Sequence, residues 1–205
     1  MNNNLCNNLF NSISGRDKCY RFLQFCEKFL SPLEKSPKSK AIYWIIKQIN
    51  HYIVMTRHIN KFGMSYDLIK KLKIKLKNKY LFCLSIDELM SIISDFLNIF
   101  YTFLDHLIFL CKINVITNIE ISKLYKLSGL IWFLNITSIA APNMMVYYKN
   151  KKISKKEKCI LVKCVCDYIV LLNLANDNKL LPKWVTGIFG MLSSALSIYT
   201  KYLLK

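Results

Sequence analysis

Residues 14–30, SGRDKCYRFLQFCEKFL, read as an amphipathic helix with its own start signal. Ser14 and Asp17 have the capping-box spacing, in which each side chain can accept a hydrogen bond from the other residue's backbone N–H. The apolar face consists of Cys19, Phe22, Leu23, Cys26, Phe29 and Leu30. The opposite face carries Asp17, Lys18, Arg21, Gln24 and Lys28. This 3.6-residue period predicts an α-helix. We expect its apolar face to pack on the following helices, with a membrane contact as the alternative.

The composition combines strong positive charge with high hydrophobicity. The 205 residues include 30 Lys and Arg against 12 Asp and Glu, yet 53% are apolar and the mean hydropathy is +0.24. Residues 1–80 hold 16 Lys and Arg against four acidic residues, whereas residues 81–148 hold three Lys against five. A net charge of +18 favours nucleic acid or an anionic membrane surface as the partner. The uncharged segments described below favour the membrane.

The N-terminal part divides into an Asn-rich tail, residues 1–12, expected to be disordered, and a basic amphipathic region, residues 13–80, expected in the cytosol. Pro32 and Pro37 interrupt this region, and two further helices are predicted over residues 41–62 and 65–80. An apolar stripe and surrounding cations make them candidates for membrane binding. The candidate residues are Ile42, Ile45, Ile46, Ile49, Tyr52, Ile53, Lys47, Arg57, Lys61, Lys70, Lys71 and Lys73.

The remaining chain is predicted to hold two to four membrane-embedded helices. Ser85 and Glu88 form a second capping box, which opens a helix running to residue 116. The embedded regions are residues 81–148 and a C-terminal hairpin or anchor, 159–205, separated by a basic loop, 149–158. Pro142 is expected to stop or kink the helix before this loop. The candidate segments are 96–116, 128–148, 160–175 and 184–200.

Residues 184–200 make the best candidate span, because this stretch carries no charge and is flanked by Lys183 and Lys201. The positive-inside rule favours the four-segment arrangement, which places residues 1–80 and the basic loop together in the cytosol. With two spans we expect the basic loop on the wrong side.

Two groups of residues inside these segments have distinctive chemistry. Gly187, Gly190 and Ser194 form a ridge of small residues that allows close helix packing. Ionisable side chains in a membrane segment face a helix bundle or an aqueous path, since lipid disfavours them. Those residues are Asp105, His106, Lys163 and Asp167.

The fold class predicted from these features is all-α, with N-terminal amphipathic helices preceding the membrane helices of an integral membrane protein. We predict no enzyme activity, because the chain contains no phosphate-binding glycine loop, no nucleophile elbow and no histidine–carboxylate site. No metal or other cofactor is expected, since the eight cysteines and three histidines lack zinc-site spacing.

Four segments together resemble the peroxin-11 family of peroxisomal membrane elongation and division proteins. Residues 15–30 are similar to its N-terminal signature, with Gly15, Arg16, Asp17 and Lys18 as the signature residues. TRHINKFG (56–63) resembles a basic amphipathic stretch, although the order Lys-Phe-Gly differs from the family's. LDHLIFLCKI (104–113) is similar to its central helix. LVKCVCDYIVLLNLAN (161–176), followed by GIFGMLSSALSIY (187–199), resembles its C-terminal helix and anchor.

The resemblance implies an integral protein of the peroxisomal membrane, with its N-terminus facing the cytosol, that elongates the organelle before fission. It implies self-association, an import receptor for peroxisomal membrane proteins and dynamin-type fission machinery as partners, along with anionic membrane lipid. We expect no nucleic-acid partner. Two alternatives from the residues alone are a channel for small metabolites, lined by the ionisable residues above, and a soluble nucleic-acid-binding protein.

Overall fold

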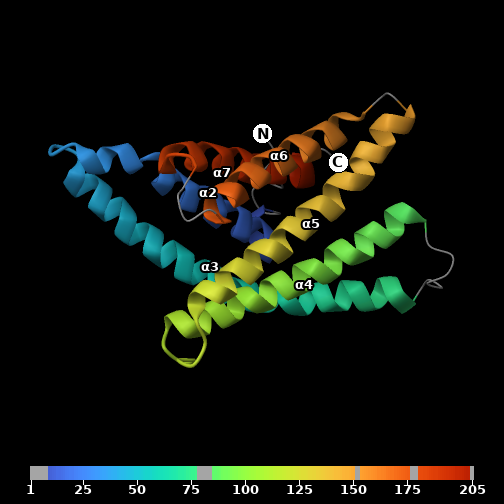
Figure 1. Cartoon of the computed structure of the whole chain (residues 1–205), viewed down its shortest axis with the longest axis horizontal. Coiled ribbons are helices and arrows are strands. Elements are labelled where there is room, and N and C mark those ends of the chain that lie inside the picture. Colours follow the sequence, from blue (N-terminus) through green and yellow to red (C-terminus); the bar gives the residue numbers. More distant parts are fainter. Residues whose placement is uncertain (1–8, 78–84, 151–152, 176–179, 204–205) are drawn as a thin grey trace. The chain divides into compact units, whose positions relative to one another are not determined.

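The computed structural model describes residues 9–77, 85–150, 153–175 and 180–203, and every regular element in these ranges is helical (Figure 1). The predicted all-α fold is therefore confirmed for the described residues. The elements are α2 (Ile13–Phe29), η1 (Ser31–Lys35), α3 (Lys40–Lys77), α4 (Ile86–Lys112), α5 (Ile121–Asn150), α6 (Lys155–Ala175), α7 (Lys183–Ile198) and η3 (Tyr199–Leu203). The 3-10 helix η1 follows α2, and the π-helical turn η3 follows α7.

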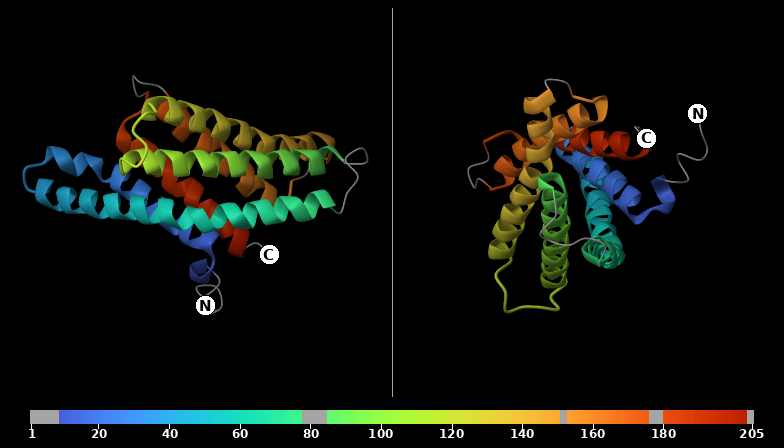
Figure 2. Two further views of the ribbon diagram at one scale, coloured as in Figure 1. Left: turned by 90° about the horizontal axis from the view of Figure 1, so that it is seen from below. Right: turned by 90° about the vertical axis from the view of Figure 1, so that its right-hand side faces the viewer.

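The chain divides into two compact units. The terminal unit comprises Met1–Asn60 and Val165–Lys205, and the central unit comprises Lys61–Cys164. Helices α3 and α6 contribute residues to both. In the terminal unit α2 lies beside α7, and in the central unit α4 lies beside α5 (Figures 1 and 2).

Helix α2 begins earlier than predicted. Ser12, not Ser14, is the N-cap: its backbone is extended and its side chain accepts a hydrogen bond from the Gly15 N–H at 3.0 Å. The predicted cap is wrong because Ser14 already lies within the helix. A side chain at Gly15 would place its Cβ 1.9 Å from the Leu9 carbonyl oxygen, so this tight start requires glycine. Of the predicted disordered tail, residues 1–8 lie outside the described residues, and residues 9–11 are helical.

Helix α3 joins the two helices predicted over residues 41–62 and 65–80 into one that continues through Gly63. A glycine inside a helix costs only about 1 kcal/mol relative to alanine, which the surrounding helical turns offset. The 38 residues span about 57 Å at 1.5 Å per residue. Residues 78–80 of the prediction lie outside the described residues.

Helix α4 opens with the predicted capping box: Ser85 Oγ accepts from the Glu88 N–H at 3.3 Å, and Glu88 Oε2 accepts from the Ser85 N–H at 3.1 Å. It ends at Lys112 rather than residue 116, because Asn114 adopts a left-handed φ of 58°. Its contact with α5 contains the apolar cluster of Leu104, Ile108, Cys111 and Leu124.

Helix α5 continues through Pro142 to Asn150, so of the two predicted effects of Pro142, a stop or a kink, the stop is wrong. The Asn143 side chain supports this turn by donating from Nδ2 to the Ile139 carbonyl at 2.7 Å. The predicted basic loop over 149–158 is shorter than expected, because α6 begins at Lys155. An unpredicted capping box between Ser154 and Glu157 starts α6 there.

Two described helices are long and apolar enough to cross a membrane, Ile86–Lys112 and Ile121–Tyr148. Residues 184–200 are not among these two helices, because α7 has only 16 residues before the backbone widens into η3, and the span predicted there stays a prediction. Spans at α4 and α5 would return the chain to its starting side before residues 149–158. Two spans at these helices would therefore keep the basic loop on the same side as residues 1–80.

Candidate membrane-contact surface and buried polar network

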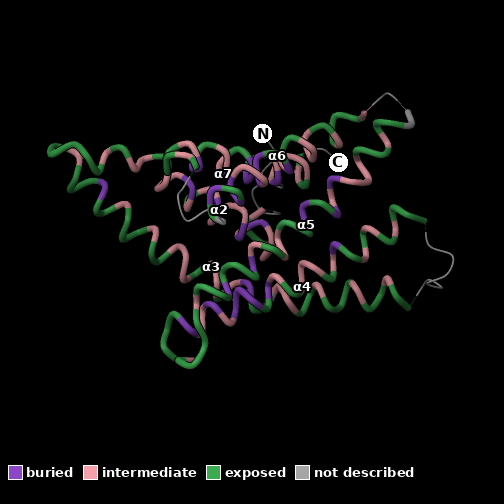
Figure 3. Tube along the Cα trace, viewed as in Figure 1, coloured by how far each residue is buried: buried purple, intermediate pink, exposed green. Residues whose placement is uncertain are grey.

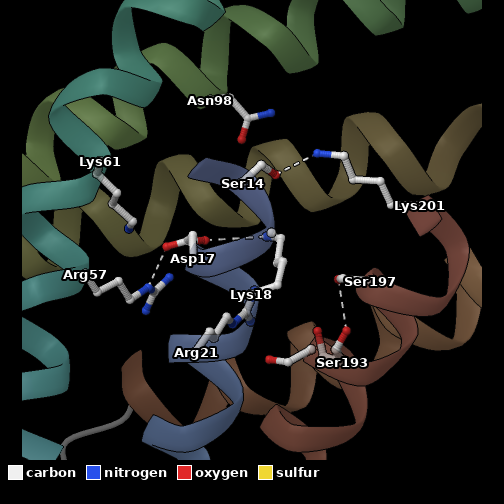
Figure 4. A network of polar contacts seen from close by, with 12 residues as sticks. Ser14, Asp17, Lys18, Arg21, Arg57, Lys61, Asn98, Ser193, Ser197 and Lys201 are labelled. Atoms are coloured by element: carbon white, nitrogen blue, oxygen red, sulfur yellow. Dashed lines mark hydrogen bonds and ion pairs between the residues drawn. The ribbon is translucent and has the colours of Figure 1, made fainter. Parts of the chain in front are cut away.

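Two charged residues on the polar face of α2, Asp17 and Arg21, are buried. Asp17 is 3% exposed, and its Oδ1 accepts from Nε of Arg57 in α3 at 2.8 Å (Figure 4). Arg57 also donates from Nη1 to Gln24 Oε1 at 2.9 Å. One guanidinium therefore joins two side chains of α2 to α3.

A second buried ion pair joins α2, α6 and α7. Arg21 donates from Nη2 to Oδ1 of Asp167 at 2.6 Å, and the Ser193 hydroxyl donates to the same oxygen at 2.5 Å. Asp167 and Ser193 are fully buried, and Arg21 is 7% exposed. Removing charges from water is costly unless they are paired and hydrogen-bonded, and this geometry meets both conditions.

Small residues bring α7 against α2. A Cβ added at Gly187 would lie 2.4 Å from the backbone nitrogen of Phe29, and one at Gly190 would lie 2.2 Å from the Phe25 ring. Ser194, the third predicted packing residue, is buried and donates to the Gly190 carbonyl of its own helix at 2.9 Å. The approach of the two helices depends on glycine at both positions.

The helix ends of the terminal unit are also connected. The Ser12 and Tyr202 hydroxyls are 2.6 Å apart, and Lys201 donates to Ser14 Oγ at 2.8 Å (Figure 4). At the opposite end of α7, Asn173 Nδ2 donates to Thr186 Oγ1 at 2.6 Å. Hydrogen bonds thus connect η3 to the start of α2, and α7 to α6 through Thr186 and Ser193.

In the central unit, buried polar side chains connect α3 to α4. Lys61 forms an ion pair with Asp105, and its ammonium group lies 5.0 Å from the centre of the Tyr101 ring. Ser65 Oγ lies 2.8 Å from His106 Nε2. Phe62 stacks on the His106 ring with a centroid distance of 4.0 Å. These contacts hold the second half of α3, residues 61–77, on α4.

An asparagine clamp connects α4 to α5, the two candidate spans. Asn135 of α5 accepts from Ser94 Oγ at its Oδ1 and donates from Nδ2 to Asn98 Oδ1, both at 2.9 Å. Asn135 and Ser94 are buried. Such bonds between apolar helices fix their pairing where water cannot compete.

The first half of α3, residues 40–60, presents a different surface. Ile42, Ile45, Ile49 and Tyr52 are 53–69% exposed, and Lys47 on the other side is exposed as well (Figure 3). Ile46 and Ile53 are half-buried. An exposed apolar stripe beside exposed cations is typical of helices that lie in a membrane interface.

The predicted membrane-binding cations separate into two groups. Lys47, Lys70, Lys71 and Lys73 are exposed. Arg57 and Lys61 instead bind carboxylates inside their units, and Lys61 is only 3% exposed, so it is not available to lipid headgroups in this structure.

The other predicted residues are distributed over both units. Arg16 donates to the Phe10 carbonyl at 3.0 Å, and Lys18 Nζ lies 3.9 Å from Asp17 Oδ2. Asp105, His106 and Asp167 are buried, and Lys163 is half-buried. Asp105 and His106 lie on α4, whereas Lys163 and Asp167 lie four residues apart on α6.

Several partners in these networks were missed from the sequence. Arg21 was placed only on the face opposite the apolar stripe, and Ser193, Thr186 and Asn135 received no role. One available signal was the Asp17–Arg21 pair of opposite charges, four residues apart on a helix that is otherwise apolar on one side. The hydroxyl and amide partners lie in uncharged segments and give no comparable signal.

Residues 4–159 match the family model for peroxisomal biogenesis factor 11 (PEX11). The match covers well over half of the 205 residues. It contains the first three segments of the stated resemblance and confirms it, whereas the fourth, residues 161–199, lies beyond the matched range. Neither the curated proteins nor the solved structures include a match to the chain.

Proposed function

The chain belongs to the peroxisomal biogenesis factor 11 family, and from that membership we propose that it elongates the peroxisomal membrane by inserting α3 into one leaflet. Family membership assigns the protein to peroxisome biogenesis and associates it with peroxisomes. The family is one of biogenesis factors rather than enzymes. Integral insertion, curvature generation and fission belong to the proposal.

The exposed stripe of α3 is the observation that carries this proposal. Fully burying an Ile side chain stabilises by roughly 1.5–3 kcal/mol, so four exposed side chains provide a substantial drive toward an apolar phase. A helix lying in the interface buries its apolar side to about 5–10 Å and adds area to one leaflet. Added area on the cytosolic side favours positive curvature, which elongation requires.

Residues 40–60 are the better wedge of the two stretches predicted for this role. Residues 61–77 are docked on α4 through Lys61 and Ser65, and Lys75 forms an ion pair with Asp95. Lys70, Lys71 and Lys73 remain exposed there. Each lysine near an anionic headgroup layer contributes about 1 kcal/mol, so these side chains would strengthen membrane attachment.

Insertion of α4 and α5 as a hairpin supplies the proposed topology. Both helices satisfy the length and composition of spans, and the asparagine clamp joins them. The basic region before α4 and the lysines after α5 then share one side, which the positive-inside rule assigns to the cytosol. The N-terminus therefore faces the cytosol in this proposal.

Protein partners are proposed from the family resemblance. They are a second copy of the chain, the import receptor for peroxisomal membrane proteins and dynamin-type fission machinery. Lysines flanking apolar helices support the receptor assignment, because such receptors bind this combination of features.

The test uses the full chain reconstituted into anionic vesicles, with the fraction of elongated vesicles as the readout. Ile45→Glu and Ile49→Glu place a charge on the stripe, and we expect roughly tenfold fewer elongated vesicles. His51→Glu adds an acidic residue to the exposed opposite side and serves as the matched control. Equal elongation by the stripe variants and the control would remove α3 insertion as the mechanism.

The channel alternative makes a separate prediction. The proposed lining of this channel includes Asp105 and Asp167. Asp105 binds Lys61, and Asp167 accepts hydrogen bonds from Arg21 and Ser193. A conducting state would therefore require these bonds to open. Conductance in planar bilayers that disappears with Asp105→Asn would favour the channel over elongation.

A further inference from the structure

The terminal unit shows an inverted polarity along three of its helices. In α2, in residues 165–174 of α6 and in residues 184–198 of α7, every residue that the structure records as exposed is apolar. They are Leu23, Phe29, Val165, Leu172, Leu174, Trp184, Ile188, Leu192 and Ala195. A helix bundle folded in water has the opposite arrangement, because charged side chains belong on the outside.

The interior of the same three helices is polar. Asp17, Arg21 and Asp167 are at most 7% exposed, and Thr186 and Ser193 are at most 2% exposed. The two carboxylates bind two guanidiniums, so the buried charges cancel. Paired charges directed toward a bundle interior are the form in which ionisable residues occur in a membrane.

The exposed residues of α4 and α3 indicate which medium surrounds the three helices of the terminal unit. Residues 93–111 of α4, a candidate span by length and composition, show the same pattern: their exposed residues are Ile93, Phe96, Phe100 and Phe103. Residues 40–60 of α3 instead expose Lys47, Gln48 and His51 beside the apolar stripe. The three helices of the terminal unit therefore resemble a helix in hydrocarbon, and α3 resembles a helix at the interface.

From this polarity we propose that α2, residues 165–174 of α6 and α7 are embedded in the hydrocarbon of the bilayer, and that acyl chains cover Leu23 and Phe29 of α2. On the polar side of α2, Asp17 and Arg21 are inside the bundle, bound to Arg57 and Asp167, whereas Lys18 and Lys28 are half-buried. The helix assigned from the sequence to a cytosolic module is thus a membrane helix. This inference is independent of leaflet insertion by α3.

Embedding does not require these helices to cross the bilayer. The 17 residues of α2 and the 16 of α7 reach about 26 and 24 Å, short of a hydrocarbon core of roughly 30 Å. The lysines at the two ends of α7, Lys183 and Lys201, are exposed and can extend to the headgroups. Short helices with such ends fit within one side of the membrane.

The experiment uses the full chain in vesicles that contain a phospholipid with a photoactivatable group at the end of an acyl chain. After illumination, mass spectrometry locates the lipid adducts. We expect adducts on α2 at Leu23 and Phe29 and on α7 at Ile188 and Leu192. A second probe carries the same group on its headgroup and is expected to label η1 instead. Labelling of α2 by the headgroup probe alone would overturn the proposal.

Charge variants test the cause of embedding. Arg21→Gln leaves Asp167 charged inside the bundle, and we expect acyl-probe labelling of α2 to fall by roughly tenfold. The variant Arg21→Gln/Asp167→Asn removes both charges and is expected to regain the labelling. Labelling of α4 in the same molecules serves as the internal standard for insertion. Unchanged labelling of α2 in Arg21→Gln would contradict the role of charge pairing.

The outcome is distinguishable from that of the α3 test. Loss of vesicle elongation in the Ile45 and Ile49 variants leaves α2 labelling unaffected if both proposals hold. Failure of α2 labelling with normal elongation would reject embedding and retain the proposed function.

Discussion

Asp17 and Arg57, forty positions apart, form an ion pair that joins α2 to α3 with an Nε–Oδ1 distance of 2.8 Å. Asp17 is the third residue of the family signature, and its side chain is 4% exposed. The signature therefore has a structural role: Gly15 permits the tight helix start, and Asp17 fixes the neighbouring helix. Neither residue lies on the exposed membrane-contact stripe.

Replacing Asp17 with Asn should loosen α2. The change leaves the Arg57 guanidinium without its carboxylate, although Gln24 still accepts one of its hydrogen bonds. We expect a loss of about 2 kcal/mol, below the range for fully buried pairs because Arg57 retains some exposure. Hydrogen exchange of the α2 amides in the detergent-purified protein measures this loss. Asp67→Asn, an exposed site on α3, is the control, and an equal effect there would contradict the assignment.

Adding a methyl group between α2 and α7 should cost more at Gly187 than at Gly190. The Cβ at Gly187 would meet backbone atoms of Phe29, which cannot move alone, whereas that at Gly190 would meet the Phe25 side chain, which a change of its χ1 rotamer can displace. Overpacking of this kind costs about 1–3 kcal/mol. Thermal unfolding in detergent should therefore rank Gly187→Ala below Gly190→Ala. Ala195→Leu on the exposed side of α7 should resemble the natural protein, and a reversed order of the glycine variants would argue against this packing.

The asparagine clamp should contribute to the pairing of α4 with α5. Asn135→Ala removes two hydrogen bonds, to Ser94 and Asn98, and we expect a loss of about 1–2 kcal/mol. Thr137→Ala provides the comparison on the same helix, since the Thr137 hydroxyl donates to the Phe133 carbonyl of α5 itself. The thermal midpoint should fall for the first variant and remain close to the natural value for the second. Equal midpoints would show that the clamp adds nothing to stability.

The helical periodicity and the Ser85–Glu88 capping box could be recognised from the sequence, because both depend on residues within a few positions of one another. The sequence did not reveal which face of α2 is buried. A period of 3.6 residues separates two faces but does not state which medium each face meets. That depends on Arg57 and Asp167, which lie 40 and 146 positions from their α2 partners.

The ends of helices were also not fully predictable from the sequence. Ser14 and Ser12 are both acceptable caps by type, and the steric demand at Gly15 selects Ser12. The span assigned to residues 184–200 relied on the absence of charge and on the flanking lysines Lys183 and Lys201. The structure ends α7 at Ile198 and buries three serines of that segment, which composition could not reveal.

The start of α6 should respond to pH through Glu157. Hydrogen bonds from the Ser154 backbone and side chain lower the pKa of Glu157 below its ordinary value of 4.5. A carboxyl whose folded pKa is lowered stabilises the fold above the unfolded pKa and loses this effect as pH falls through the folded pKa. Amide protection at the first turn of α6 should therefore decrease below about pH 4.5. Glu157→Gln keeps an acceptor without a titrating proton, and its protection should not vary over this range.

The Lys61–Asp105 pair offers a double-mutant cycle in the central unit. Lys61→Met leaves a buried carboxylate, and Asp105→Leu leaves a buried ammonium, so each single change should cost about 3 kcal/mol. The variant Lys61→Met/Asp105→Leu buries apolar groups at both positions and should recover most of the loss, because neither charge then remains unpaired. Lys70→Met controls for removal of an exposed lysine. Thermal unfolding of the four variants in detergent measures the coupling. If the double variant loses the sum of the two single effects, the two residues are not coupled, and the docking of α3 on α4 must depend on Ser65 and Phe62 instead.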